Sequence, residues 1–408
     1  MAKNNGRPKH DWRRQAREIA DSLAIAFILA MVIRHFVLEV FKIPTKSMQP
    51  TLLGDPWTGD KILVNKFAFD FGEPDRWDVI VFKFPDNVSK NYIKRVVGLP
   101  GEQVWVRDGD VYIDGDIARK PWPVQNALWR RRRHSGQVEF QRGTETIRVW
   151  RADAPEYWNL VDHRFEVDCQ HAQEPQYLEY SRLVVAYEEE DFRESHSQYR
   201  SMPTSDVMVQ FALEPLALAG DVRVVFDVET SVGIAQRVDY WMVRLPLGSG
   251  PQKPEILRSG KPTEAAVGSY EFREGEAALV QVCNVDRTII VRVDGQEVAY
   301  VPYDPVKQLA DRPGYPRGTQ VLIGSKQGHV VFHKPGLYAD VYYTNYPFKR
   351  AVHEPYQIGD DEYFVLGDNS CNSNDSRGWD KRGAVPRSYL VGEAFLVLWP
   401  LGRMKIVR

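Results

Sequence analysis

The amino-acid sequence predicts a mainly β protein that a single N-terminal helix attaches to a membrane. Short runs of β-branched and aromatic residues, bounded by Gly, Pro and Asp, recur over most of the chain after residue 42. A basic leader and an apolar stretch come before them. With 408 residues the chain is too long for one small core, so we expect two or three folded units.

The N-terminal apolar stretch predicts the membrane anchor. Residues 23–33 are apolar on every face, which disfavours an amphipathic core helix. The residues that follow are large or charged, which disfavours a cleaved signal peptide. The uninterrupted apolar run is shorter than the roughly 20 residues of a typical spanning helix. We therefore place the anchor over residues 18–41, with Arg34 and His35 near the far interface. The positive-inside rule then puts residues 1–17 in the cytoplasm and the rest outside, with lipid as a partner.

Composition excludes several classes of function. A formal net charge of -2 gives no signature of nucleic-acid binding. Cys169, Cys283 and Cys371 are widely scattered, so they predict no metal site and no disulfide framework, although one disulfide stays open. The sequence has no HExxH, no clustered Cys and His and no P-loop, so no cofactor and no metal are predicted.

The pattern of strands predicts two β units, one inserted into the other. The first unit, residues 42–128 plus 351–408, is predicted to hold strands at 61–65, 79–84, 92–97, 103–107, 111–113, 363–366 and 390–399. The inserted unit, residues 129–350, is predicted to have a β-sandwich core at about 205–345, with strands at 207–213, 221–229, 238–245, 278–285 and 288–293.

Two features of the insertion leave its role open. Arg130 to Arg133 and Glu188 to Asp191 are interpreted as solvated faces, with anionic lipid as the alternative for the arginines. The segment 280–295, with 340–344, loosely resembles laminin-G and concanavalin-like jelly rolls, and this assigns no ligand. The partner of the insertion stays unknown.

Three short segments carry residues that are suited to catalysis. In Ile43-Pro-Thr-Lys-Ser-Met-Gln-Pro-Thr-Leu52, the prolines keep Ser47 out of a helix, so its hydroxyl and backbone N–H are presented together. Lys94 lies in a strand on one face with Val96, where loss of water lowers the pKa of a lysine from about 10.4. A pKa of about 8 would make that amine a usable base. The third segment, residues 366–377, is a dense loop of hydrogen-bonding side chains. Each segment also has an alternative interpretation when it is taken alone. The first suits a polar linker, the second an edge-strand lysine that reaches water, and the third an ordinary connector.

Together, and in this order, the three segments resemble the motifs of type I signal peptidases over residues 30–128 and 360–402. The resemblance implies a β catalytic domain of coiled sheets or a partial barrel, with Ser47 as nucleophile and Lys94 as general base. The resemblance also implies that Thr45, in place of a serine, forms the oxyanion hole with the Ser47 N–H, and that Ser373 orients the lysine. It implies a structural ion pair between Asp375 and Arg377. Ile43 and Ile93 would line apolar pockets for small substrate side chains.

The resemblance also implies an activity. A signal peptidase I removes signal peptides from exported preproteins after Ala-x-Ala sequences through an acyl-enzyme, at the outer face of the cytoplasmic membrane. This chain departs from the family pattern at Asn369-Ser-Cys-Asn372, at Asp380-Lys-Arg382 and in its long insertion. Two rivals stay open. A self-cleaving Ser–Lys repressor would need a helix-turn-helix, and none is recognisable in the sequence. The other rival is a tethered binding protein whose sandwich recognises glycan.

Overall fold

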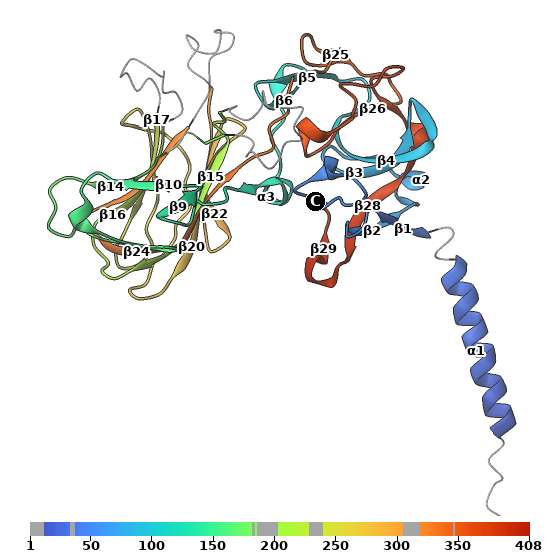
Figure 1. Ribbon diagram of the computed structural model, residues 1–408, viewed down its shortest axis with the longest axis horizontal. Coiled ribbons are helices and arrows are strands. Elements are labelled where there is room, and N and C mark those ends of the chain that lie inside the picture. Colours follow the sequence, from blue (N-terminus) through green and yellow to red (C-terminus); the bar gives the residue numbers. More distant parts are fainter. Residues whose placement is uncertain are drawn as a thin grey trace, which may run out of the picture.

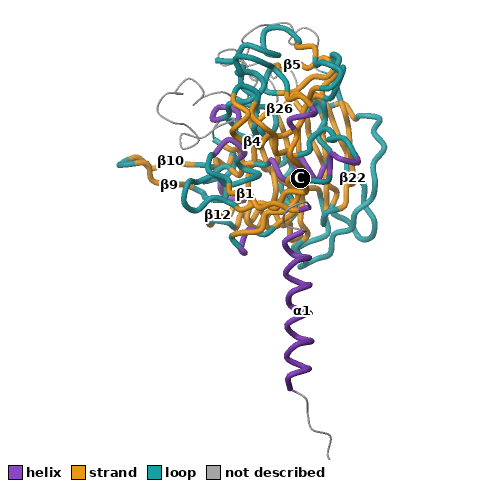
Figure 2. The backbone as a smooth tube through the Cα atoms, turned by 90° about the vertical axis from the view of Figure 1, so that its right-hand side faces the viewer, coloured by secondary structure: helices purple, strands orange, loops and turns teal. Residues whose placement is uncertain are grey.

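The computed structural model describes residues 12–32, 37–181, 184–185, 203–227, 240–304, 319–345 and 347–408. Helix α1 (Trp12–Val32) projects from a body in which strands, joined by loops, are the main regular structure (Figures 1 and 2). A mainly β fold is therefore confirmed. Within the described part of the chain, no helix combines the length and the apolar character that crossing a membrane requires.

The segment after α1 differs from the prediction, because the chain is already a strand before residue 41. Strand β1 (Leu38–Lys42) pairs antiparallel with β2 (Lys61–Asn65), with Leu38 opposite Asn65 and Lys42 opposite Lys61. Leu38, Val40 and Phe41 are residues that favour a pleated surface, and β2 supplies partners for their backbone groups. The predicted anchor thus does not continue to Phe41 as a helix. Residues 1–11, Arg34 and His35 lie outside the described residues.

The Ser–Lys unit, as we name residues 37–128 and 347–408, is built on two antiparallel sheets. The larger sheet has the order β1, β2, β28, β3, β4, β26, β27, with β29 added beside β28. Its further strands are β28 (Leu390–Trp399), β3 (Val79–Phe84), β4 (Asn87–Gly98), β26 (Glu362–Leu366), β27 (Val385–Pro386) and β29 (Lys405–Ile406). The smaller sheet comprises β25 (Tyr356–Gln357), β5 (Gln103–Arg107), β6 (Asp110–Ile113) and β7 (Asp116–Ile117). Short helices α2 (Ala68–Phe71) and α3 (Trp122–Leu128) complete the unit.

The inserted unit, which we call the sandwich, consists of two stacked sheets. The first comprises β11 (Trp150–Ala152), β14 (Gln176–Tyr180), β23 (Gln320–Lys326), β16 (Asp221–Asp227), β17 (Tyr240–Pro246), β18 (Glu255–Arg258) and β19 (Lys261–Pro262). The second comprises β12 (Trp158–Val161), β13 (Arg164–Asp168), β24 (His329–Ala339), β15 (Val207–Pro215), β20 (Ala278–Val285), β21 (Thr288–Val293) and β22 (Gln296–Pro302), with β8 (Arg130–Arg131) paired to β24. A small hairpin, β9 (Glu139–Arg142) and β10 (Glu145–Arg148), lies outside both. One continuous apolar core lies between the two sheets of the sandwich.

Three predictions about the insertion need correction. The sandwich core begins at Trp150 rather than at about 205, because β14 pairs with β23 and β13 pairs with β24. Arg130 and Arg132 are buried, 8% and 3% exposed, where β8 pairs with β24, whereas Arg131 and Arg133 are exposed, so only part of this run is a solvated face. The three cysteines are free thiols, so the disulfide left open is not formed. Glu188 to Asp191 lie outside the described residues.

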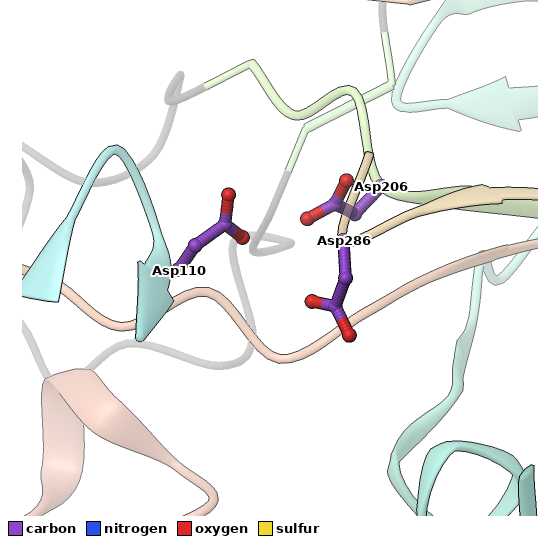
Figure 3. A group of neighbouring side chains, drawn as sticks. All are labelled: Asp110, Asp206 and Asp286. Atoms are coloured by element: carbon purple, nitrogen blue, oxygen red, sulfur yellow. The ribbon is translucent and has the colours of Figure 1, made fainter. Parts of the chain in front are cut away.

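Charged side chains join the two units. Lys120, from the Ser–Lys unit, lies 2.6 Å from a carboxylate oxygen of Asp286 and 3.0 Å from one of Asp340. Asp110, Asp206 and Asp286 bring carboxylate oxygens within 4.8 Å of one another, and Figure 3 shows all three side chains at this boundary. Burial and the neighbouring charge of Asp286 raise the pKa of Asp110 to about 7. Burial and Asp110 likewise raise the pKa of Asp206. The cluster therefore holds protons that separate carboxylates would release.

Asp110→Asn should stabilise the fold more at pH 8 than at pH 4. A raised folded-state pKa contributes stability that is present below the ordinary value of 3.8 and is lost as the pH rises through about 7. Asparagine does not ionise and escapes that loss, so we expect a gain on the order of 1–3 kcal/mol at pH 8 that fades toward pH 4. Thermal unfolding across this range measures it. Asp116→Asn, at an exposed carboxylate, is the control, and an Asp110→Asn effect that is independent of pH would contradict the account.

Candidate active site

Ser47 lies in a single 3-10 turn, residues Lys46–Met48, that follows the extended Thr45. Its side chain is buried, and the turn is anchored by Met48 and Leu52, which are both 0% exposed. The Leu52 N–H donates to the Met48 carbonyl at 2.8 Å, which closes the loop behind the serine. Gly54 leaves no room for a side chain, because a Cβ there would lie 1.5 Å from the Thr45 carbonyl oxygen. The two prolines and this close packing hold the serine in one place.

Lys94 approaches Ser47 from β4. Its Nζ donates to the Ser47 Oγ at 2.8 Å and to the Ile93 carbonyl at 2.9 Å. The side chain is only 4% exposed, and the Tyr92 ring lies 5.5 Å from the Nζ. The predicted apolar strand face therefore exists, and it places the two residues that the sequence singled out within hydrogen-bond distance.

Burial gives Lys94 the properties of a base. Loss of water lowers the pKa of its ammonium to about 8, although the carboxylates of Asp375 and Asp368 pull it upward. The Arg377 guanidinium adds to the lowering. At pH 8 about half of the molecules then carry a neutral amine, whereas a free lysine with a pKa of about 10.4 is almost wholly charged.

The loop at residues 366–377 clamps the turn that carries Ser47. The Asn369 N–H donates to the Ser47 carbonyl at 2.9 Å, and the Asn369 Nδ2 donates to the Lys46 carbonyl at 3.1 Å. Gly367 permits this contact, since a Cβ there would lie 2.6 Å from the Ser47 carbonyl oxygen. The sequence indicated the loop but not the role of Asn369, because the bonds join positions more than 300 residues apart.

Two buried ion pairs support the site. Arg377 and Asp375, the predicted pair, are both 0% exposed and share two hydrogen bonds, at 2.9 and 2.7 Å. Burial would raise the pKa of Asp375, but the Arg377 charge lowers it below its ordinary value. Arg95 and Asp368 form a second, equally buried pair, at 2.8 and 2.7 Å, which sequence reasoning missed. The available signal was an arginine in an apolar strand, which requires a buried acid as its partner.

The structure also places the remaining predicted site residues. The Thr45 Oγ1 lies 3.4 Å from the Ser47 Oγ. Ser373 is 7% exposed and lies against Gly367, but it makes no hydrogen bond to Lys94 within the described residues. Ile43 belongs to the apolar cluster that contains Met48, and Ile93 packs against the same cluster. In the described ranges, the acidic cluster at the unit boundary is the one group with metal-ligand spacing, and it contains none of these residues.

Part of this chain is similar in sequence to several signal peptidases. The chain is 32% identical to a signal peptidase I of Pseudomonas fluorescens over 172 residues, covering 36% of this chain and 59% of the relative. It is 40% identical to that of Pseudomonas aeruginosa over 113 residues, covering 24% of this chain and 38% of the relative. Signal peptidase I T of Bacillus subtilis is 36% identical, with 27% of this chain and 54% of the relative covered. The matches thus span between about two fifths and three fifths of these relatives.

Solved structures match about half of this chain, at low identity. The exoplasmic/lumenal domain of VIP36 in its metal-free form covers 52% of this chain and 93% of its own, at 8% identity and a TM-score of 0.34. The carbohydrate binding module CBM66 from Bacillus subtilis covers 46% of this chain and 93% of its own, at 8% identity and a TM-score of 0.29.

A family profile gives the broadest match. The family described as "Signal peptidase, peptidase S26" matches residues 16–164 and 286–399, which together make up well over half of the chain. The first matched segment includes Ser47 and Lys94, and the second includes the clamping loop and both acidic partners of the ion pairs. With Ser47, Lys94 and the loop at residues 366–377 in family order and in contact, this chain belongs to the S26 signal peptidase family.

Proposed function

We propose that this protein is a signal peptidase I that cleaves signal peptides from exported preproteins with a Ser–Lys dyad. The observation that carries the proposal is the 2.8 Å contact between the Ser47 Oγ and the Nζ of the buried Lys94. A serine hydroxyl is a weak nucleophile until a neighbouring base takes its proton. Family membership supports preproteins as the substrate class.

In the first step, the neutral amine of Lys94 takes the proton of the Ser47 hydroxyl as its Oγ attacks the scissile carbonyl. The 2.8 Å separation suits this transfer without movement of either side chain. The lysine then returns the proton to the leaving amine, and an acyl-enzyme on Ser47 remains. A water activated by the same amine releases the signal peptide and restores the serine.

The negative charge of the tetrahedral intermediate needs donors close to the Ser47 Oγ. The backbone N–H of Ser47 and the hydroxyl of Thr45 are suited to this role, and the Thr45 Oγ1 lies 3.4 Å from the nucleophile. We assign Ser373 to orienting Lys94 during the proton transfers, on the basis of its burial beside Gly367. Ile43 and Ile93 supply apolar contacts for the small side chains before the cleavage site, because Ile43 belongs to the apolar cluster that contains Met48 and Ile93 packs against that cluster.

The pH dependence of cleavage provides the primary test. The kcat/KM of the detergent-solubilised protein on an Ala-x-Ala preprotein should rise with pH and level off above about 8, because only the neutral amine of Lys94 accepts a proton. Two pH units below that point, the rate should be about a hundredfold lower. Ser47→Ala and Lys94→Ala should each lose activity by on the order of 10⁴-fold. Rates at each pH, with mass spectrometry of the cut site, measure this.

Matched variants separate the supporting roles. Thr45→Ser keeps a hydroxyl and should stay within a few-fold of the wild type, whereas Thr45→Val should lose about 10²-fold in kcat. Ser373→Ala should lower kcat while leaving KM nearly unchanged. Wild-type protein that leaves several such preproteins uncut, or alanine variants that cut as fast as the wild type, would refute the dyad assignment.

We further propose that the protein is attached to the cytoplasmic membrane through its N-terminal region, with the Ser–Lys unit outside the cytoplasm. The basic leader and the apolar residues 23–33 support this. The Ser–Lys unit also exposes apolar side chains near β29: Trp399, Leu401, Met404 and Ile406. In Figure 1, β29 and α1 extend toward the same side of the molecule, which suits contact with one lipid surface.

Flotation with lipid vesicles tests this attachment. The full chain, reconstituted into vesicles with a fraction of anionic lipid, should float with them in a density gradient and stay bound at high salt. Deletion of residues 1–36 should leave only weak binding, which Leu401→Glu with Met404→Glu should abolish. Firm flotation of the doubly substituted, truncated protein would contradict the proposed route of attachment.

A further inference from the structure

The sandwich extends one side chain into the surroundings of the dyad. Arg130 follows Trp129, which packs in an apolar cluster with Met208 and Cys283 of the sandwich. The Arg130 backbone pairs with β24 opposite Ala339, and the Arg132 guanidinium lies 3.3 to 3.4 Å from the Arg130 carbonyl. Sandwich contacts therefore fix the base of this side chain.

The far end of Arg130 bridges the two loops that form the active site. Its terminal NH2 group donates to the Gln49 carbonyl at 2.7 Å and to the Asp368 carbonyl at 2.8 Å. Gln49 closes the turn that carries Ser47, and Asp368 precedes Asn369, which donates to the Ser47 carbonyl. One guanidinium nitrogen has two N–H groups that point apart, so a single group can hold two carbonyls at a fixed separation.

We infer that Arg130 is a positioning residue for Ser47, and that the sandwich is through it a working part of the active site. This rests on the proposed protease function, since the position of Ser47 matters for catalysis only if Ser47 is the nucleophile. Arg130 touches neither member of the dyad directly. It acts through the backbone on both sides, holding the serine turn against the clamping loop and so holding the Ser47 Oγ at hydrogen-bond distance from Lys94.

A second contact at the other crossing between the units points the same way. Thr344, which follows the last sandwich strand, accepts a hydrogen bond at 2.7 Å from Arg377 of the buried pair. Its N–H donates to the Ser370 hydroxyl at 2.9 Å. The chain thus enters and leaves the sandwich beside the loop that clamps Ser47, and hydrogen bonds secure both crossings.

Steady-state kinetics of the full chain test the inference. Arg130→Ala should lower kcat by about 10- to 100-fold, since small displacements of a catalytic group have effects of this size, while KM changes little. Arg130→Lys should fall between that variant and the wild type, because an ammonium lacks the planar fork. Ethylguanidinium in the buffer should restore part of the Arg130→Ala activity. Arg131→Ala, at the exposed neighbour in the same strand, is the matched control and should remain at the wild-type rate.

Hydrogen exchange supplies a measurement that does not depend on cleavage. Arg130→Ala, but not Arg131→Ala, should speed exchange at the amides of Gln49, Leu52 and Asn369 while the sandwich strands stay protected. A variant with normal kcat and normal exchange would overturn the inference. A loss of kcat in Arg130→Ala that parallels global unfolding, and that ethylguanidinium does not restore, would also overturn the inference. If the wild-type protein cuts no preprotein but Arg130→Ala still speeds exchange at these amides, the protease function is refuted, while the positioning of the Ser47 turn by Arg130 stands.

Discussion

The site depends on keeping the Lys94 amine out of water. A lysine in solvent is charged and cannot take a proton from serine, so the fold must bear the cost of burying it. Strand β4 places it on an apolar face, and the turn at Ser47 covers it. The nearby carboxylates of Asp375 and Asp368 would restore the charge if they were free. Each acid forms a buried ion pair with an arginine, and this limits how far the two carboxylates raise the pKa of Lys94.

These ion pairs also bind the backbone around Ser47 and Lys94. Each arginine has several donors and a buried acid, and the remaining donors bind backbone carbonyls, such as Trp77 for Arg95 and Thr344 for Arg377. Breaking one pair would leave an uncompensated charge in the interior, at a cost of roughly 3–5 kcal/mol. Asn369 and Arg130 extend the same principle to the serine turn, where carbonyls of Ser47, Lys46 and Gln49 all receive donors from distant segments.

Local patterns in the sequence predicted much of this, and long-range contacts account for the rest. The strands at 61–65, 79–84, 278–285 and 390–399 have the predicted bounds, because alternation and turn residues are local signals. Strands such as Gln176–Tyr180 were missed because they are short and half polar. The Arg95–Asp368 pair joins residues 273 positions apart, and Arg130 reaches Asp368 across 238 positions, so no local rule brings them together. The predicted anchor extends too far because Leu38, Val40 and Phe41 suit a membrane helix as well as a strand.

The most direct test of the account is to titrate Lys94 itself. In protein labelled with 13C at lysine Cε, the signal that disappears in Lys94→Met identifies the residue, and its chemical shift is followed from pH 6 to 11. We expect a midpoint at about 8, set by burial, in the protein without substrate. A midpoint near about 10.4, the value of a lysine in water, would mean that the amine is charged at neutral pH and would contradict its role as the base.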